Sequence, residues 1–305
     1  MFELDHRGAL GDDTTTQALS VLPLVVLVGA TSAVLVKLSS APSAVKVSYR
    51  LGFATLGFAA FSAIAYRDAF REFSGRDLLV ASASGIVLGG HYLVWFESLL
   101  WTTVAASTTL VQTQTIFVAA LAYLLLDENV TRRTVAGLVF AVAGAAFMSL
   151  GGLAVGSLLN GANPVLGNLL AIAAGLLFAG YILISRWIRQ RVAAIPYVTV
   201  VHLLATVVAF LFAAGTGESV ALWAYPRYEW LLFFAMGFGP SFVAQSLSNW
   251  AIRYVPSNVV SVSYLGTPVV SSIYALVFLA EVPGVGTLVG GALTLFGIYV
   301  AIRTP

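Results

Sequence analysis

Charged side chains are scarce in this chain: Asp, Glu, Lys and Arg make up 9% of its 305 residues, whereas hydrophobic residues make up 59%. An average soluble domain carries about 25% charged residues. A soluble fold of this length would therefore have too few charges to cover its surface. In a bilayer the outer surface is apolar, and one membrane helix needs about 20 apolar residues. The composition predicts an all-α integral membrane protein with about ten transmembrane helices.

Other absences exclude classes of chemistry. The chain has no cysteine, which excludes disulfides, thiolate metal ligands and a cysteine nucleophile. It has three histidines and no HExxH motif, and no pair of acids or Ser–His arrangement falls within an apolar run. Its formal net charge of +2 is too small for a nucleic-acid-binding surface. We therefore expect no catalytic residues, no metal and no cofactor.

The chain begins with a polar segment, MFELDHRGALGDDTTTQ, which lacks the basic start of a signal peptide. We predict a disordered cytoplasmic tail over residues 1–17, a first five-helix repeat over 18–151 and a second five-helix repeat over 165–302. Short breaks with turn residues separate the apolar runs. The runs lie at 18–38, 43–66, 78–100, 103–126, 133–151, 165–187, 195–214, 229–252, 256–280 and 284–302.

The loops differ in their content of Lys and Arg, which indicates the orientation of the chain. With an even number of spans, both termini lie on one side of the membrane. That side carries eleven Lys and Arg residues, and the other side carries the remaining four. Cytoplasmic loops are enriched in these residues. We expect both termini in the cytoplasm and the protein in the inner membrane of a bacterium.

An internal repeat becomes visible when the chain is shifted on itself by 153 residues. Each copy has an apolar helix with small and hydroxyl residues, followed by an acid and a glycine-containing helix. Because each half has an odd number of spans, the second half lies upside down relative to the first. Inverted repeats are typical of secondary transporters, which bind substrate near the midplane between the halves. Four pairs of identical residues at this offset are Leu126 with Leu279, Glu128 with Glu281, Gly137 with Gly290, and Gly144 with Gly297.

Two segments carry a family resemblance: LLLDENVTRRTVAGLVFAVAGAAF (124–147) and LVFLAEVPGVGTLVGGALTLFGIYV (276–300). With the ten-helix plan they resemble the drug/metabolite transporter superfamily in its EamA-type branch, over almost the whole chain. That family often has a proline in the middle of the fourth and ninth helices; Pro268 fits, whereas the first-half position is Thr115. The resemblance implies export of small metabolites, notably amino acids. Within the family, the chain is most similar to the aromatic amino acid exporters of the YddG type.

Polar and aromatic residues inside the third apolar run are candidates for a binding site, because uncompensated polar groups are costly in lipid. His91, Tyr92 and Trp95 suit an aromatic wall that stacks on a substrate. The alternative is a helix–helix hydrogen bond for His91 and a place in the interfacial aromatic belt for Trp95. Trp101 is a further candidate for the binding site, and Glu97 lies one turn before it. Its carboxylate is suited to a substrate ammonium group or to proton coupling, or it simply reaches water.

Further candidates lie in other apolar runs. Gln112 and Gln114 are two apart near the centre of the fourth run, so we expect one in the cavity and the other against a neighbouring helix. In the eighth run Pro240 predicts a kink, whose freed backbone groups need a cavity or a neighbouring helix. That kink either binds substrate or only packs against its neighbours. The remaining candidates for the cavity wall are Tyr181, Gln245, Asn249 and Tyr264.

Lys46 and Arg50 lie four residues apart near the outer end of the second run. We expect both to extend to lipid headgroups, as long cationic side chains do; otherwise they form a cationic outer vestibule. The other runs have no Lys or Arg at midplane depth, which argues against sugar phosphates as substrates. His202 is isolated, and we expect it to have a structural role.

Two functions remain open. The first is export of amino acids, aromatic or broadly neutral, by alternating access, either as uniport or coupled to protons. The second is a proton-coupled antiporter for drugs or quaternary cations, which would need an essential membrane carboxylate and an aromatic cage. In both cases the expected partners are a small-molecule substrate and membrane lipids.

Overall fold

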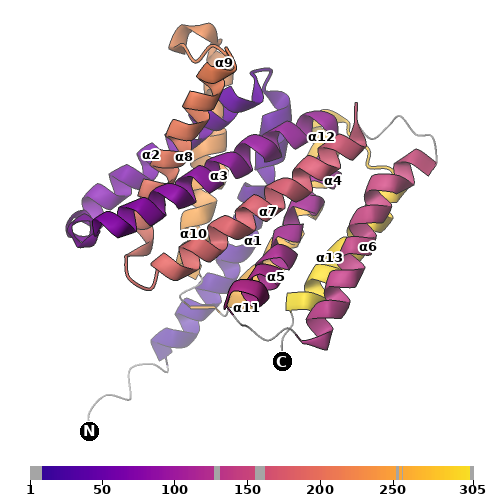
Figure 1. The fold of residues 1–305 in the computed structure, drawn as a ribbon, viewed down its shortest axis with the longest axis horizontal. Coiled ribbons are helices and arrows are strands. Elements are labelled where there is room, and N and C mark those ends of the chain that lie inside the picture. Colours follow the sequence, from indigo (N-terminus) through magenta and orange to yellow (C-terminus); the bar gives the residue numbers. More distant parts are fainter. Residues whose placement is uncertain (1–8, 127–130, 155–161, 252–253, 256, 303–305) are drawn as a thin grey trace.

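The computed structural model describes residues 9–126, 131–154, 162–251, 254–255 and 257–302. Within these ranges the chain forms helices and turns, and no strand is present (Figure 1). The first half contains α1 (Ala9–Leu38), α2 (Ser43–Ala65), α3 (Gly75–Trp101), α4 (Val104–Leu110), α5 (Gln114–Leu126) and α6 (Arg132–Ala154). The second half contains α7 (Pro164–Ile188), α8 (Ala194–Gly215), α9 (Arg227–Met236), α10 (Ala244–Ala251), α11 (Ser257–Tyr264), α12 (Gly266–Leu279) and α13 (Val285–Ile302).

Several of these helices join into longer rods. A 3₁₀ turn at Val111–Thr113 joins α4 to α5, a π-helical turn at Gly237–Val243 joins α9 to α10, and α12 follows α11 directly after Leu265. Counted over the described residues, ten rods result, as the apolar runs predict. Eight segments in the described part are long and apolar enough to cross a membrane, and α13 is a shorter apolar helix. The predicted all-helical membrane fold is therefore confirmed.

The first helix is longer than the hydropathy pattern predicts. Apolarity predicts a start at Ala18, whereas α1 begins at Ala9. The additional turns contain Asp12 and Asp13, so apolarity alone does not reveal them. Residues 1–8 of the predicted tail lie outside the described residues, and so does Glu128, the repeat partner of Glu281.

The α6–α13 pair shows how the two halves are related. A Cβ atom at Gly137 would collide with the carbonyl oxygen of Gly297, and one at Gly144 would collide with that of Gly290. The second contact is the first one with the halves exchanged, because the repeat offset is 153 residues. Residue numbers rise along one helix as they fall along the other, so the helices are antiparallel. A two-fold relation between antiparallel membrane helices lies in the membrane plane, and the repeats are therefore inverted.

The remaining helices pack across the two halves in matching pairs. Helix α3 packs on α7, and the corresponding α9–α10 rod packs on α1. Helix α12 packs on α1, and the corresponding α4–α5 rod packs on α7. Helices α2 and α8, which correspond to each other, are in direct contact. Each half therefore lacks a separate core, and the centre of the bundle is the interface between the halves (Figure 1).

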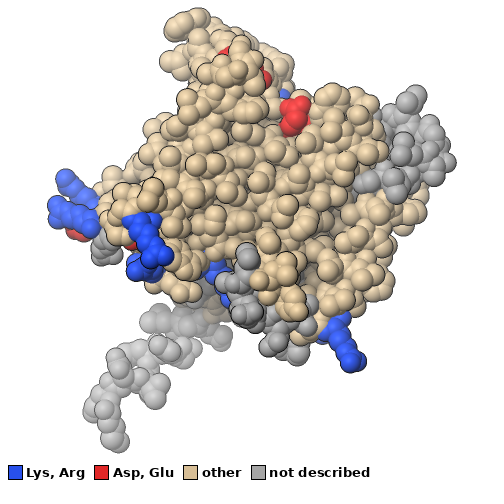
Figure 2. Space-filling model, in the orientation of Figure 1, with Lys and Arg blue, Asp and Glu red and all other residues tan. Residues whose placement is uncertain are grey.

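The two sides of the bundle differ in charge. Helix α1 begins and α13 ends on the same side, which we call the terminal side; the other is the opposite side (Figure 1). Figure 2 shows Lys and Arg side chains along the left and lower edges of the molecule, on the terminal side. Uncharged side chains cover most of the rest of that view. This arrangement fits a belt of lipid around the middle of the bundle.

We predict that Gly144→Ala destabilises the protein by about 1–3 kcal/mol, because the added methyl group overpacks the α6–α13 crossing. The matched control is Gly215→Ala at the end of α8, where an added Cβ meets nothing within 4 Å. Thermal unfolding of the purified protein in detergent, followed by size exclusion, measures both. Equal unfolding temperatures for the two variants would contradict the close approach of these helices.

Candidate substrate-binding site

A cavity of about 480 Å³ lies between the two halves. Its wall comes from α1, α3 and the α4–α5 rod on one side, and from α7, α10 and the α11–α12 junction on the other. Binding sites for small molecules typically measure about 300–1,000 Å³, so its size suits a small metabolite. Eight residues that the sequence indicates as site or kink residues lie in this wall: Tyr92, Gln112, Gln114, Tyr181, Pro240, Gln245, Asn249 and Tyr264.

The cavity extends from the middle of the bundle toward the terminal side. Asn249, near the end of α10, and Val260, near the start of α11, both belong to its wall. Those two helix ends lie on the terminal side. A second hollow of about 430 Å³, between α5, α6 and the end of α13, is lined mainly by alkyl groups and offers little to orient a polar molecule. The first cavity is therefore the candidate site.

The two glutamines lie on the same cavity wall, contrary to the expectation that they point apart. Gln112 donates from Nε2 to the carbonyl oxygen of Tyr264 at 2.9 Å, and Gln114 donates from Nε2 to Oε1 of Gln112 at 3.0 Å. The expectation is wrong because a 3₁₀ turn replaces α-helix here. Side chains two positions apart point about 120° away from each other in a 3₁₀ turn, whereas they point about 160° away from each other in an α-helix. The pair joins the α4–α5 rod to the α11–α12 junction.

Breaks in the rods expose backbone groups at the cavity. Pro240 lies inside the π-helical turn between α9 and α10, and this turn contributes to the wall. The second break follows Tyr264, whose carbonyl oxygen binds Gln112 and not the next turn of helix. Pro268 lies buried in the first turn of α12, just after that break, and is absent from the described cavity wall. Irregular backbone within a bilayer is stable only where protein or a cavity surrounds it.

The other candidates on α3 lie outside the cavity wall. His91 is buried, and its Nδ1 lies 2.9 Å from the carbonyl oxygen of Ala174 on α7, so the structure shows a helix–helix hydrogen bond there. Trp95 is stacked with His91, with ring centroids 6.2 Å apart. Trp101 donates from Nε1 to Oε1 of Glu97 at 2.9 Å, at the end of α3 on the opposite side. Neither Glu97 nor Trp101 belongs to the described wall of the cavity.

Lys46 and Arg50 are buried, so the expectation that they extend to lipid headgroups is wrong. Lys46 is 2% exposed and donates from Nζ to the carbonyl oxygen of Val36 at 3.0 Å. Arg50 is 4% exposed and donates to hydroxyls of Ser241 and Ser32. The reason lies in the position of α2, which packs against α3, α8 and α9, so that this face of the helix meets protein and not lipid.

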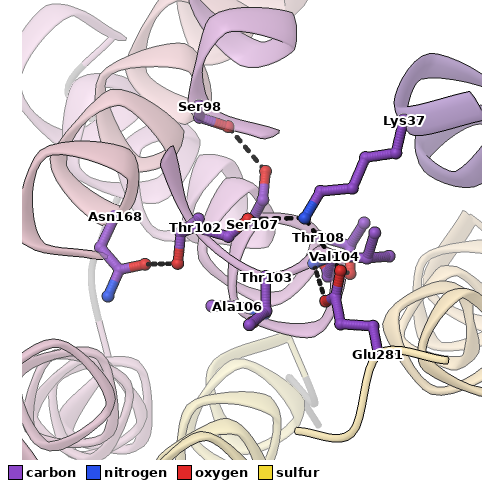
Figure 3. Close-up of polar contacts among 10 residues, drawn as sticks. All are labelled: Lys37, Ser98, Thr102, Thr103, Val104, Ala106, Ser107, Thr108, Asn168 and Glu281. Atoms are coloured by element: carbon purple, nitrogen blue, oxygen red, sulfur yellow. Dashed lines mark hydrogen bonds and ion pairs between the residues drawn. The ribbon is translucent and has the colours of Figure 1, made fainter. Parts of the chain in front are cut away.

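An ion pair between Lys37 and Glu281 joins the two halves on the opposite side (Figure 3). The Nζ atom of Lys37, at the end of α1, lies 2.9 Å from Oε2 of Glu281, just after α12. Lys37 also donates to the carbonyl oxygen of Thr102 at 2.9 Å, and the backbone N–H of Val104 donates to Oε1 of Glu281 at 2.5 Å. We call these four residues the latch. They hold α1, α12 and the α3–α4 turn together.

A second set of contacts reinforces the closure. Glu229, at the start of α9, accepts hydrogen bonds from the Ser39 hydroxyl at 2.5 Å and from the backbone N–H of Ser40 at 2.7 Å. These bonds fix the α1–α2 loop to the second half. Sequence reasoning did not single out Lys37 or Glu229. The available signal was a cation in the last turn of one helix and acids at the ends of others, all on the opposite side.

Comparisons with known proteins agree with this architecture. The sequence model of the EamA-like transporter family matches this chain twice, over residues 17–150 and 165–303. The uncharacterized transporter YetK of Bacillus subtilis (strain 168) is 26% identical over 249 residues, which is 79% of this chain and 70% of that protein. A solved crystal structure with 19% identity covers 94% of this chain and 97% of its own, with a TM-score of 0.64, which shows a common fold.

The latch predicts state-dependent access. We expect Lys37→Met to increase exposure of the protein interior from the opposite side up to about fivefold, because losing a partly exposed ion pair of up to about 1 kcal/mol shifts the equilibrium by that factor. The chain has no cysteine, so Thr108→Cys, a buried position one turn inside the latch, provides a single reporter. The rate of labelling by a membrane-impermeant maleimide measures the exposure.

The matched control is Arg71→Met, which removes the exposed ion pair between Arg71 and Asp68. We expect no change in the labelling rate for this variant. Equal rates for Lys37→Met and Arg71→Met would show that the latch does not hold the opposite side closed.

Proposed function

Because the chain belongs to the EamA-like transporter family, we propose that it is a secondary transporter that exports small zwitterionic metabolites, amino acids above all, by alternating access. The observation that carries this proposal is a polar cavity between two inverted halves, with the latch formed on the opposite side. The excess of Lys and Arg on the terminal side supports a cytoplasmic location for that side. The described conformation would then face the cytoplasm and receive substrate from it.

The chemistry of the cavity supports a small neutral or zwitterionic substrate. The described wall contains amides and tyrosines but no Asp, Glu, Lys or Arg. Asn249 has a buried Nδ2 atom without a hydrogen-bond partner, so an acceptor on a ligand would satisfy it. Tyr92, Phe178 and Tyr181 supply aromatic surface for an apolar or aromatic side chain. These properties together suit amino acids with uncharged side chains.

The inverted repeat supports alternating access. Two halves of similar structure and opposite direction have two related arrangements, one open to each side. The described arrangement has the latch formed on the opposite side and the cavity on the terminal side. Breaks at Pro240 and after Tyr264 provide places where the rods bend. Export then requires opening of the latch after the substrate has bound.

A proton-coupled antiporter for cations is less well supported. Such a carrier needs a carboxylate in its binding site. Glu97 accepts a hydrogen bond from Trp101 outside the described cavity wall, and that wall holds no acid. Cation flux that depends on Glu97, without amino-acid flux, would favour this function and overturn the proposal.

We predict that Gln245→Ala raises the KM for amino-acid transport about threefold to tenfold, because one hydrogen bond to a substrate contributes about 0.5–1.5 kcal/mol. Initial rates of uptake of radiolabelled amino acids into proteoliposomes measure the KM, with and without a proton gradient. The matched control is Gln190→Ala, an exposed glutamine in the turn after α7. An unchanged KM for Gln245→Ala would remove this residue from the site.

A further inference from the structure

Arg50 is a buried cation close to the cavity. Its Nε donates to the Ser241 hydroxyl at 2.8 Å, and its Nη1 donates to the Ser32 hydroxyl at 2.5 Å. Its Cζ atom lies 4.5 Å from the centre of the Tyr92 ring, and the rings of Phe96 and Trp95 lie at 5.2 Å and 5.8 Å. The guanidinium group is therefore surrounded by two hydroxyls and three aromatic rings.

The partners of Arg50 belong to the cavity wall or adjoin it. Tyr92 lines the cavity, Ser241 follows the lining residue Pro240, and Ser32 lies one turn of α1 beyond the lining residue Gly29. Lys37 of the latch is five residues further along α1 than Ser32, or about 7.5 Å along the helix axis. Arg50 therefore contacts α1 between the cavity wall at Gly29 and the latch at Lys37.

No described acid neutralises Arg50. The ion pairs in the described part of the chain join Lys37 to Glu281 and Arg71 to Asp68, and neither includes Arg50. A buried charge without a counter-ion costs several kcal/mol, and cation–π contacts recover about 2 kcal/mol. A neutral side chain would join the same helices at lower cost. An ionisable residue retained in a membrane interior on these terms indicates a functional role.

A neighbouring donor, the indole N–H of Trp95, lacks a hydrogen-bond partner. The Nε1 atom of Trp95 is buried and makes no hydrogen bond, and the ring of Trp95 is one of the three that surround Arg50. A cation without a counter-ion therefore lies 5.8 Å from the centre of a ring whose N–H group has no acceptor. An anionic oxygen ligand would neutralise the cation and could accept from the N–H group. A carboxylate suits the planar guanidinium, which binds it through two parallel hydrogen bonds.

We propose that Arg50 binds the carboxylate of the transported molecule and so limits the substrates to monocarboxylates, including zwitterionic amino acids. The carboxylate reaches Arg50 from the cavity as the Tyr92 ring moves aside, and the rest of the molecule stays among the amides and tyrosines. One positive charge matches one carboxylate, and it repels cations that lack a carboxylate. This inference rests on the proposed transport function and names the chemical group that the site selects.

The test compares ligands that differ only at the carboxylate. We expect wild-type protein in detergent to bind L-phenylalanine at least about tenfold more tightly than L-phenylalaninamide, because a charge-assisted bidentate contact is lost in the amide. Arg50→Gln should weaken the affinity for L-phenylalanine at least about tenfold and change the affinity for L-phenylalaninamide less than about twofold. Arg50→Lys, which keeps the charge, should fall between the two. Isothermal titration calorimetry measures all three.

The ratio of the two affinities separates recognition from a structural role. A merely structural role of Arg50 would weaken both ligands together and leave their ratio unchanged. The matched control is Arg76→Gln, whose arginine also stacks on a tryptophan, Trp187, but lies at the start of α3, on the terminal side and outside the described cavity wall. It should leave the ratio as in wild type. The comparison of the two ligands on wild-type protein does not depend on whether a variant folds. Equal affinity of wild-type protein for L-phenylalanine and L-phenylalaninamide would overturn the inference.

The outcomes distinguish failure of this inference from failure of the proposed function. Amino-acid transport with an unchanged ratio in Arg50→Gln would retain the function and overturn the role of Arg50. Transport of 3-phenylpropionate but of no amino acid would overturn the proposed function. The role of Arg50 would then be supported if wild-type protein bound 3-phenylpropionate more tightly than its amide and Arg50→Gln bound the two equally. Transport of phenethylamine alone would overturn both.

Discussion

A polar group within the bilayer must find its partner inside the protein, because lipid offers none. In this protein three sets of buried or partly buried polar groups meet that requirement by pairing across the two halves. The amides at the cavity, the guanidinium beside it and the latch above it each join a helix of the first half to one of the second. These contacts mark the interface along which a substrate would pass. The pairs are Gln112 with Tyr264, Arg50 with Ser241, and Lys37 with Glu281.

The inverted symmetry divides the contacts between the halves into two kinds. The α6–α13 crossing maps onto itself when the halves exchange, so the same glycine packing would serve both states of the proposed transport cycle. The latch does not map onto itself, because the residue 153 positions after Lys37 is Gln190. Closure on the terminal side therefore needs different chemistry. A carrier built in this way keeps a constant rim and changes its contacts near the substrate route.

Much of the fold follows from the sequence, because apolar runs, loop charges and a repeat offset are local properties of the chain. The same patterns place Gln245, Asn249 and Tyr264 on a common cavity, since polar groups at midplane depth have few other uses. They do not show that Gln112 and Gln114 share a wall, because a 3₁₀ turn replaces the helical geometry that periodicity assumes. They also miss the start of α1, which continues as helix beyond its apolar part.

The burial of Arg50 is the least predictable feature, because the sequence of α2 does not reveal whether this face of the helix meets lipid headgroups or three other helices. The packing of the helices decides the environment of Arg50, and it leaves a buried cation that is partly solvated by neutral groups. Such partial solvation suits a carrier. Complete neutralisation by an acid of the protein would leave nothing for a substrate to improve. A wholly unsolvated charge would bind an anion too tightly to release it. Hydroxyls and aromatic rings lie between these limits, so a substrate carboxylate gains from binding and still leaves.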